Sequence, residues 1–224
     1  MAISALPPAA DAAMTADETD EVAALYAGLQ RIYNIQDNRG RPVGNCKNGI
    51  YLFYDYDGEP IYVGQSTESL RQRIGRHMTN RRTDAVAMNV LDPFEVAEIE
   101  MWPFWDLQTD AKATLDRAEY TVYQKAISES AFRIILNEGA IGEADLIALP
   151  QSYRGTILPD EARHLREHPD IRLARRARTI ADLARVISER KVKVGIRRTL
   201  WAQAQRLEWL AKNRLEELYG PQDE

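Results

Sequence analysis

Apolar residues along the chain fall into short blocks whose spacing predicts strands and helices in turn. Residues 50–54 and 60–63 are rich in β-branched and aromatic side chains. Asp57-Gly58 between them is a two-residue turn signal, so the pattern predicts a β-hairpin. Two further apolar blocks, residues 94–101 and 132–136, predict two more strands.

Helical spacing of apolar residues separates these strands. The pattern predicts a short helix before the hairpin, a helix that begins at Ser66-Thr67-Glu68, and a third helix over residues 110–128. The apolar stripes of the first two helices are Val22, Leu25, Leu29 and Ile32, and Leu70, Ile74 and Met78. The order β-β-α-β-α-β predicts an α+β fold, with a small mixed or antiparallel sheet flanked by helices.

The composition divides the chain into three regions. Residues 1–22 hold five acidic and no basic residues, which predicts a flexible acidic leader. Residues 23–148 carry the strand and helix pattern, and residues 149–224 are mostly helix-forming. The last helix has a Leu/Trp stripe that could build a homodimer, made of Leu200, Trp201, Leu207, Trp209, Leu210 and Leu218.

Overall composition is that of a soluble globular protein, with 45% apolar and 28% charged residues in 224. The single cysteine, Cys46, excludes a disulfide framework and a cysteine-based zinc site. No apolar stretch is long enough to span a membrane, and the first residues lack the features of a secretory signal. We therefore expect a cytoplasmic protein without a membrane partner.

A net charge of −5 taken alone argues against a nucleic-acid binder, but the charge is segregated. Residues 172–198 contain ten Lys and Arg against two Asp and Glu, a net charge of +8. This density favours phosphate contact. The residues expected to bind DNA are Arg175, Arg176, Arg178, Lys191, Lys193, Arg197 and Arg198.

Three interpretations of this basic region remain open. A helix-turn-helix could span residues 179–200 with its turn near Ser188, although Gly195 would then sit inside the second helix. A helical cap with a phosphate-binding stripe fits the pattern better. A charged face that is only solvated is the third possibility.

The hairpin contains Gly49-Ile50-Tyr51 and Tyr62-Val63-Gly64, with the two tyrosines 11 residues apart. Arg73 and His77, four residues apart, share one face of the next predicted helix. Glu119 lies within the third predicted helix, and Asn137 directly follows the block 132–136. The six positions in this order, over about residues 47–140, resemble the GIY-YIG endonuclease family.

The chemistry of these side chains suits phosphodiester hydrolysis. A carboxylate such as Glu119 can hold Mg²⁺ (or Mn²⁺), which keeps most of its sites for water and phosphate oxygens. Arg73, chosen over its neighbours for its spacing to His77, offers a planar cation for a phosphate. The resemblance implies that Tyr51 helps to activate a water, that Tyr62 and His77 assist, and that Asn137 supports the site geometry.

The sequence thus predicts a divalent-metal-dependent DNA endonuclease. By analogy within the family, we expect a restriction-like, phage-defence or mobile-element role rather than DNA repair. The alternative is a non-catalytic DNA-binding module on a fold derived from a nuclease.

Overall fold

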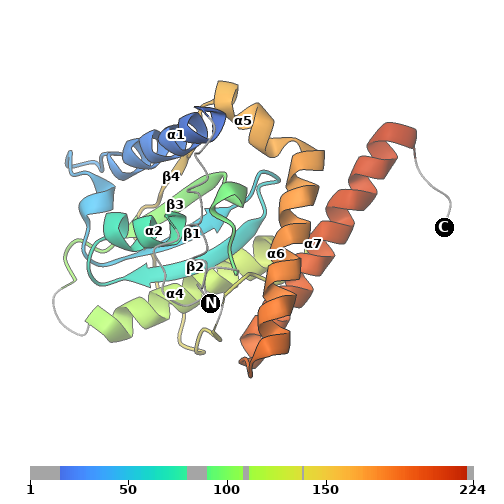
Figure 1. Ribbon diagram of the computed structural model, residues 1–224. Helices are drawn as coiled ribbons and strands as arrows, with labels where there is room; N and C mark the ends of the chain where they lie inside the picture. Colours follow the sequence, from blue (N-terminus) through green and yellow to red (C-terminus); the bar gives the residue numbers. More distant parts are fainter. Residues whose placement is uncertain (1–15, 80–89, 108–110, 138, 221–224) are drawn as a thin grey trace, which may run out of the picture.

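The computed structural model describes residues 16–79, 90–107, 111–137 and 139–220. Its centre is an antiparallel sheet of four strands in the order β2-β1-β3-β4 (Figure 1). The strands are β1 (Gly49–Tyr54), β2 (Pro60–Ser66), β3 (Glu98–Pro103) and β4 (Tyr153–Thr156). The predicted α+β fold with a small antiparallel sheet is confirmed.

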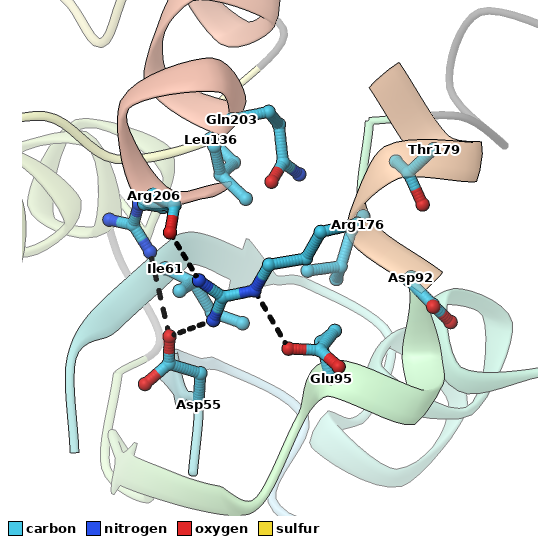
Figure 2. Close-up of a pocket in the computed structure, with 10 residues that line it drawn as sticks. Asp55, Ile61, Asp92, Glu95, Leu136, Arg176, Thr179, Gln203 and Arg206 are labelled. Carbon is cyan, nitrogen blue, oxygen red and sulfur yellow. Dashed lines mark hydrogen bonds and ion pairs between the residues drawn. The ribbon is translucent and has the colours of Figure 1, made fainter. Parts of the chain in front are cut away.

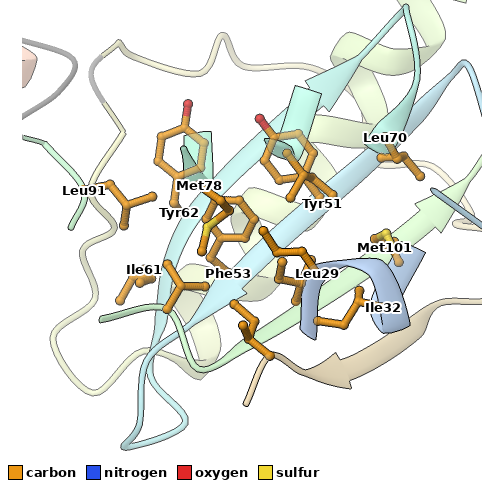
Figure 3. Packing of buried hydrophobic residues seen from close by; sticks show 14 of the residues in the cluster. Leu29, Ile32, Tyr51, Phe53, Ile61, Tyr62, Leu70, Met78, Leu91 and Met101 are labelled. Atoms are coloured by element: carbon orange, nitrogen blue, oxygen red, sulfur yellow. The ribbon is translucent and has the colours of Figure 1, made fainter. Parts of the chain in front are cut away.

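Helices cover both faces of the sheet. On one face lie α1 (Ala16–Tyr33) and α2 (Leu70–Met78), which pack with Tyr51 and Phe53 of β1 (Figure 3). On the other face α4 (Ala111–Glu129) packs with the alternate residues of β1. Every residue of β1 is therefore buried, which explains why this strand is a continuous apolar run.

Two element boundaries differ from the sequence-based expectation. The helix expected from Ser66 begins at Leu70, because Ser66 still belongs to β2 and the Ser69 side chain caps the helix by accepting a hydrogen bond from Gln72 N. The strand expected over 94–101 is instead a short 3₁₀ helix, η2 (Pro93–Glu95), followed by β3. A second 3₁₀ helix, η1 (Val43–Asn45), precedes β1.

The strand predicted at residues 132–136 is wrong, and the fourth strand is β4. Arg133 has a φ of 55°, which is incompatible with an extended strand. The segment that follows still runs beside β2, because Leu136 N donates to Ile61 O over 2.7 Å. The block 132–136 therefore has the apolar composition of a strand because it runs along the edge of the sheet, although it does not form a strand.

The N-terminal prediction lies partly outside the described residues. Residues 1–15 of the expected acidic leader, and Asp110 of the third expected helix, are not among them. The remainder of the leader belongs to α1, which begins at Ala16. In the described part of the chain, no helix combines the length and apolar character needed to cross a membrane.

Three helices follow β4 in the described part of the chain: α5 (Asp160–Glu167), α6 (Pro169–Glu189) and α7 (Val194–Tyr219). The last two pack against each other as a long helical hairpin whose turn lies at residues 190–193 rather than near Ser188. The sheet includes β4, so it extends past the domain boundary expected at residue 148. The helical hairpin begins after that strand. The expected Leu/Trp stripe packs partly on the protein itself: Leu210 is buried and Trp209 contacts Phe132.

A buried set of ion pairs, here called the ion-pair clamp, joins this hairpin to the sheet domain (Figure 2). Arg176 Nη2 lies 2.9 Å from Asp55 Oδ2, and Arg176 Nε lies 3.0 Å from Glu95 Oε2. Arg206 of α7 donates to the backbone oxygens of Pro60 and Ile134. The clamp consists of Asp55, Asp57, Glu59 and Glu95 with Arg172, Arg175, Arg176 and Arg206.

The clamp balances four carboxylates against four guanidinium groups, and all of these residues except Asp57 and Arg175 are buried. Burial raises the pKa of Asp55, while the neighbouring Arg176 opposes that rise. Breaking one buried pair leaves its partner charge unpaired, which is costly. The clamp therefore fixes the hairpin against the sheet.

Candidate active site

The register of the β1–β2 hairpin brings the two tripeptides together. Tyr51 pairs with Gly64, and Phe53 pairs with Tyr62. Because alternate residues of a strand share a face, both tyrosines lie on the α1/α2 side, with ring centroids 6.3 Å apart. Figure 3 shows their hydroxyl groups pointing out of the apolar cluster toward the same side.

Both glycines of the tripeptides are required by close packing. A Cβ at Gly64 would lie 2.3 Å from Tyr51 Oη and 2.4 Å from Tyr51 Cζ, so only glycine allows the ring to cover this strand. A Cβ at Gly49 would lie 2.9 Å from the side chain of Leu70. Gly64 thus allows Tyr51, and Gly49 allows α2, to pack closely against the β1–β2 hairpin.

His77 of α2 completes a buried aromatic group with the two tyrosines. Its Nε2 lies 2.8 Å from Tyr51 Oη, which makes a buried hydrogen bond. The His77 ring also packs on Tyr62, with centroids 4.9 Å apart. Tyr51 is fully buried, whereas Tyr62 forms part of a cavity wall. Of these three aromatic side chains, Tyr62 is the one that lines the cavity.

The cavity has a volume of about 570 Å³ and brings together four of the six predicted residues. These are Tyr62, Arg73, Glu119 and Asn137, from β2, α2, α4 and the segment after α4. The rest of its wall comes from Asp116 and from residues 139–144. Side chains separated by up to 75 positions in sequence thus meet in one space.

Arg73 is the arginine of α2 that faces this cavity. Arg71 donates to Gln30 and Asn34, and Arg76 forms an ion pair with Glu68. The Nε of Arg73, in contrast, is buried without a hydrogen-bond partner. An arginine at a cavity wall whose buried Nε has no hydrogen-bond partner is suited to bind an anion there.

Two carboxylates of α4, Asp116 and Glu119, also line the cavity, and sequence reasoning found only Glu119. Gln65 Nε2 donates to Glu119 Oε2 over 2.9 Å and to Asp116 Oδ1 over 2.8 Å. Burial raises the pKa of Glu119, and the nearby charge of Asp116 adds to the rise, while Gln65 and Arg73 oppose it. Asp116 and Glu119 are three residues apart on a helix, and that spacing was the available signal.

Asn137 acts on the backbone of β2. Its Oδ1 accepts a hydrogen bond from Val63 N, and its Nδ2 donates to Val63 O over 2.7 Å. The side chain therefore occupies the ladder position that another strand would take at the edge of the sheet. This contact holds the middle residue of the second tripeptide, next to the cavity.

Comparison with known proteins assigns this arrangement to a domain family. A scan against models of protein families matches residues 47–126 to the GIY-YIG catalytic domain. Residues 47–126 are a GIY-YIG catalytic domain. The searches of curated proteins and of solved structures found no match.

The GIY-YIG catalytic domain is a nuclease domain that hydrolyses phosphodiesters, so the chain carries a nuclease. The matched segment contains five of the six predicted residues: Tyr51, Tyr62, Arg73, His77 and Glu119. Asn137 and the helical hairpin lie beyond it. A phosphodiester-hydrolysing domain implies a nucleic-acid substrate.

The donor set in the GIY-YIG cavity fits a divalent metal. Glu119 and Asp116 supply carboxylate oxygens, the ligands that Mg²⁺ and Mn²⁺ accept, and the cavity leaves room for water and phosphate. Among the described residues, no group of three or more His, Cys, Asp or Glu side chains could hold a metal. A site with few protein ligands is the kind that Mg²⁺ uses together with substrate phosphates.

The structure divides the seven basic residues expected to bind DNA. Arg175 and Arg176 belong to the ion-pair clamp, and Arg176 is buried, so the expectation of a phosphate contact fails for these two. Their guanidinium groups neutralise buried carboxylates of the nuclease domain instead. The other five are exposed: Arg178, Lys191, Lys193, Arg197 and Arg198.

Proposed function

We propose that the protein is a divalent-metal-dependent DNA endonuclease whose active site is the cavity lined by Tyr62, Arg73 and Glu119. The observation that carries this proposal is a pairing of opposite charges across one open space. Arg73, whose buried Nε has no hydrogen-bond partner, lines this space together with Asp116 and Glu119. Phosphodiester hydrolysis needs both: a cation for the phosphate and oxygen ligands for a metal.

Arg73 would bind the scissile phosphate. Its planar fork can contact two phosphate oxygens at once, and its charge stabilises the negative charge that develops on them. Burial of Nε strengthens this interaction, because the surrounding dielectric is lower than that of water. We therefore assign the phosphate position to the Arg73 side of the cavity.

Glu119 would hold Mg²⁺ or Mn²⁺, with Asp116 beside it. When bound, the metal neutralises charge on the phosphate and polarises water. Gln65 orients both carboxylates by donating to each of them. The raised pKa of Glu119 places its ionisation, and hence metal binding, at a higher pH than for an exposed glutamate.

The proton of the attacking water would pass to the Tyr51–His77 pair. These side chains share a hydrogen bond of 2.8 Å, so a proton that reaches one can be held between both. Tyr62 packs on His77 and lines the cavity, so it connects the pair to the site. Water oxygen bonds to phosphorus, the ester P–O bond breaks, and the leaving oxygen takes a proton from solvent. Asn137 keeps its predicted role of holding β2.

Duplex or single-stranded DNA would approach over the exposed basic residues of the helical hairpin. We propose that the C-terminal helices act as one unit with the nuclease domain, because the clamp joins them. We further propose a restriction-like, phage-defence or mobile-element role, by analogy within the family. The single cysteine supports a location in the cytoplasm.

Supercoiled plasmid DNA provides the test. The protein is expected to nick or linearise it in Mg²⁺ or Mn²⁺ and to leave it intact in excess EDTA. Cleavage that persists in EDTA, or no cleavage with either metal at any protein concentration, would contradict the proposal. Mapping the cut positions on a sequenced plasmid tests the biological role: recurring sites support a restriction-like or mobile-element enzyme.

A further inference from the structure

The turn between α6 and α7 carries the highest density of unpaired cations in the described chain. Residues 190–198 contain five basic and no acidic residues. We call this segment the basic tip, defined by Arg190, Lys191, Lys193, Arg197 and Arg198. All five side chains are exposed, and none forms an ion pair with any other residue that the structure describes. They differ in this from the arginines of the ion-pair clamp on the same two helices.

The start of α7 is held against the catalytic domain, beside the cavity. Thr199 Oγ1 donates to the backbone oxygen of Asn137 over 3.4 Å, and Asn137 lines the cavity. Gln203 Nε2 donates to Val90 O, and Ile196 is buried in the core. The basic tip is therefore positioned at a fixed place relative to the catalytic residues.

An exposed tryptophan stands among these cations. Trp201 follows Arg197 by four residues and Arg198 by three, so the three share the outer face of α7. The Trp201 side chain is 55% exposed, although tryptophan is normally well buried. A large aromatic group left in water next to cations points to a partner that is both anionic and aromatic.

We propose that the basic tip holds an unpaired segment of the DNA substrate next to the cavity, and that Trp201 stacks on one of its bases. This inference rests on the proposed nuclease function and names its substrate as a junction between paired and unpaired DNA. In a duplex the bases stack on one another and leave no free face for Trp201. Binding a duplex would need only the cations, which contact its phosphates. In an unpaired strand each base offers a free face to an aromatic side chain.

Geometry and charge support this occupant over a second copy of the chain. A helix is about 10 Å across. A short unpaired strand is therefore long enough to reach from the outer face of α7 to the cavity wall at Asn137. A symmetric contact through the same face would place two basic tips opposite each other. Their like charges would oppose that contact, whereas a nucleic-acid strand neutralises them.

Metal-free binding experiments test the inference separately from cleavage. Fluorescence anisotropy would measure the Kd of the full chain for three labelled DNA probes of equal length, a duplex, a single strand and a splayed duplex, in EDTA. Trp201→Leu keeps apolar bulk without the stacking plane, and Trp201→Phe restores an aromatic face. Tyr219→Ala, at the far exposed end of α7, is the matched control.

Trp201→Leu is expected to weaken binding to the single-stranded and splayed probes about tenfold and to leave duplex binding within twofold. Trp201→Phe should recover most of the loss, and Tyr219→Ala should change nothing. Replacing Arg197 and Arg198 together by alanine should lower the salt slope for single strands by about 1.4.

Equal losses on all three probes, or no loss on any, would overturn the inference. A change of sedimentation mass in Trp201→Leu would overturn it in favour of self-association. Failure of the wild-type protein to cut both plasmid and the splayed duplex in Mg²⁺ or Mn²⁺ would contradict the nuclease proposal alone, because the binding measurements need no metal.

Discussion

Replacing Gly64 by alanine probes the packing that seats Tyr51 in the active site. The new Cβ would lie 2.3 Å from Tyr51 Oη, whereas ordinary contacts begin near 3.4 Å. The phenol must therefore move by about 1 Å, and Tyr51 has no free space because it is fully buried. The 2.8 Å hydrogen bond to His77 would then be lost or badly strained.

Two costs add in this variant. Overpacking a tight core costs about 1–3 kcal/mol, and leaving buried polar groups unpaired costs a similar amount. We expect Gly64→Ala to lower the free energy of unfolding by about 3 kcal/mol, and the Tm by about 6–12 °C for a chain of this size. A displacement of about 1 Å near reacting groups should also reduce cleavage about 100-fold.

Urea denaturation, thermal melting and plasmid cleavage would be compared with a control in the same cavity. Gly142→Ala is that control, since its Cβ would meet no atom within 4 Å. It should stay within about 0.5 kcal/mol of the wild type and keep its activity. A Gly64→Ala protein as stable and active as Gly142→Ala would refute the packing argument.

Three further variants test the charges. Arg73→Lys should cut plasmid about tenfold more slowly or worse, because lysine lacks the planar fork, while Arg76→Lys, outside the cavity, should match the wild type; equal rates for both would remove Arg73 from the site. Asp116→Asn removes a negative charge that raises the pKa of Glu119, so the acid limb of the pH–rate profile at saturating Mg²⁺ should move to lower pH; a shift to higher pH would contradict that sign. Arg176→Met should lower the free energy of unfolding in urea by about 3 kcal/mol, because it removes the nearest cation of Asp55 and leaves the ion-pair clamp with more carboxylates than guanidinium groups; unchanged stability combined with weaker DNA binding would restore its predicted role.

The β1–β2 hairpin and the helix that carries Arg73 and His77 were predictable because their signals are local. Alternating aromatic and β-branched residues on both sides of Asp57-Gly58 determine the β1–β2 pairing. The i,i+4 spacing of Arg73 and His77 places both on one face of α2. Arg73 and Glu119 meet at one cavity, in agreement with the family resemblance, whose order of motifs spans both helices.

The fourth strand escaped prediction because its signal is weak. Tyr153–Thr156 is four residues long and half exposed, and its pairing with β3 is decided by tertiary contact. The block 132–136 has the stronger strand composition but contains Arg133 at positive φ. Composition could not reveal that backbone conformation.

The roles of the basic residues also depended on contacts distant in sequence. Arg176 and Lys193 lie in the same dense run of positive charge, yet one is buried and the other exposed. The difference arises from Asp55 and Glu95, which lie 121 and 81 residues before Arg176. Charge density identified a basic region, and only the fold separates the clamp from the tip.

Plasmid cleavage by Glu119→Ala beside Glu143→Ala tests the central claim most directly. Both glutamates line the cavity, but only Glu119 accepts a hydrogen bond from Gln65 and lies beside Asp116 on α4. Our account predicts that Glu119→Ala loses metal-dependent cleavage while still binding DNA, and that Glu143→Ala cuts at close to the wild-type rate. Cleavage that persists unchanged in Glu119→Ala would contradict the account.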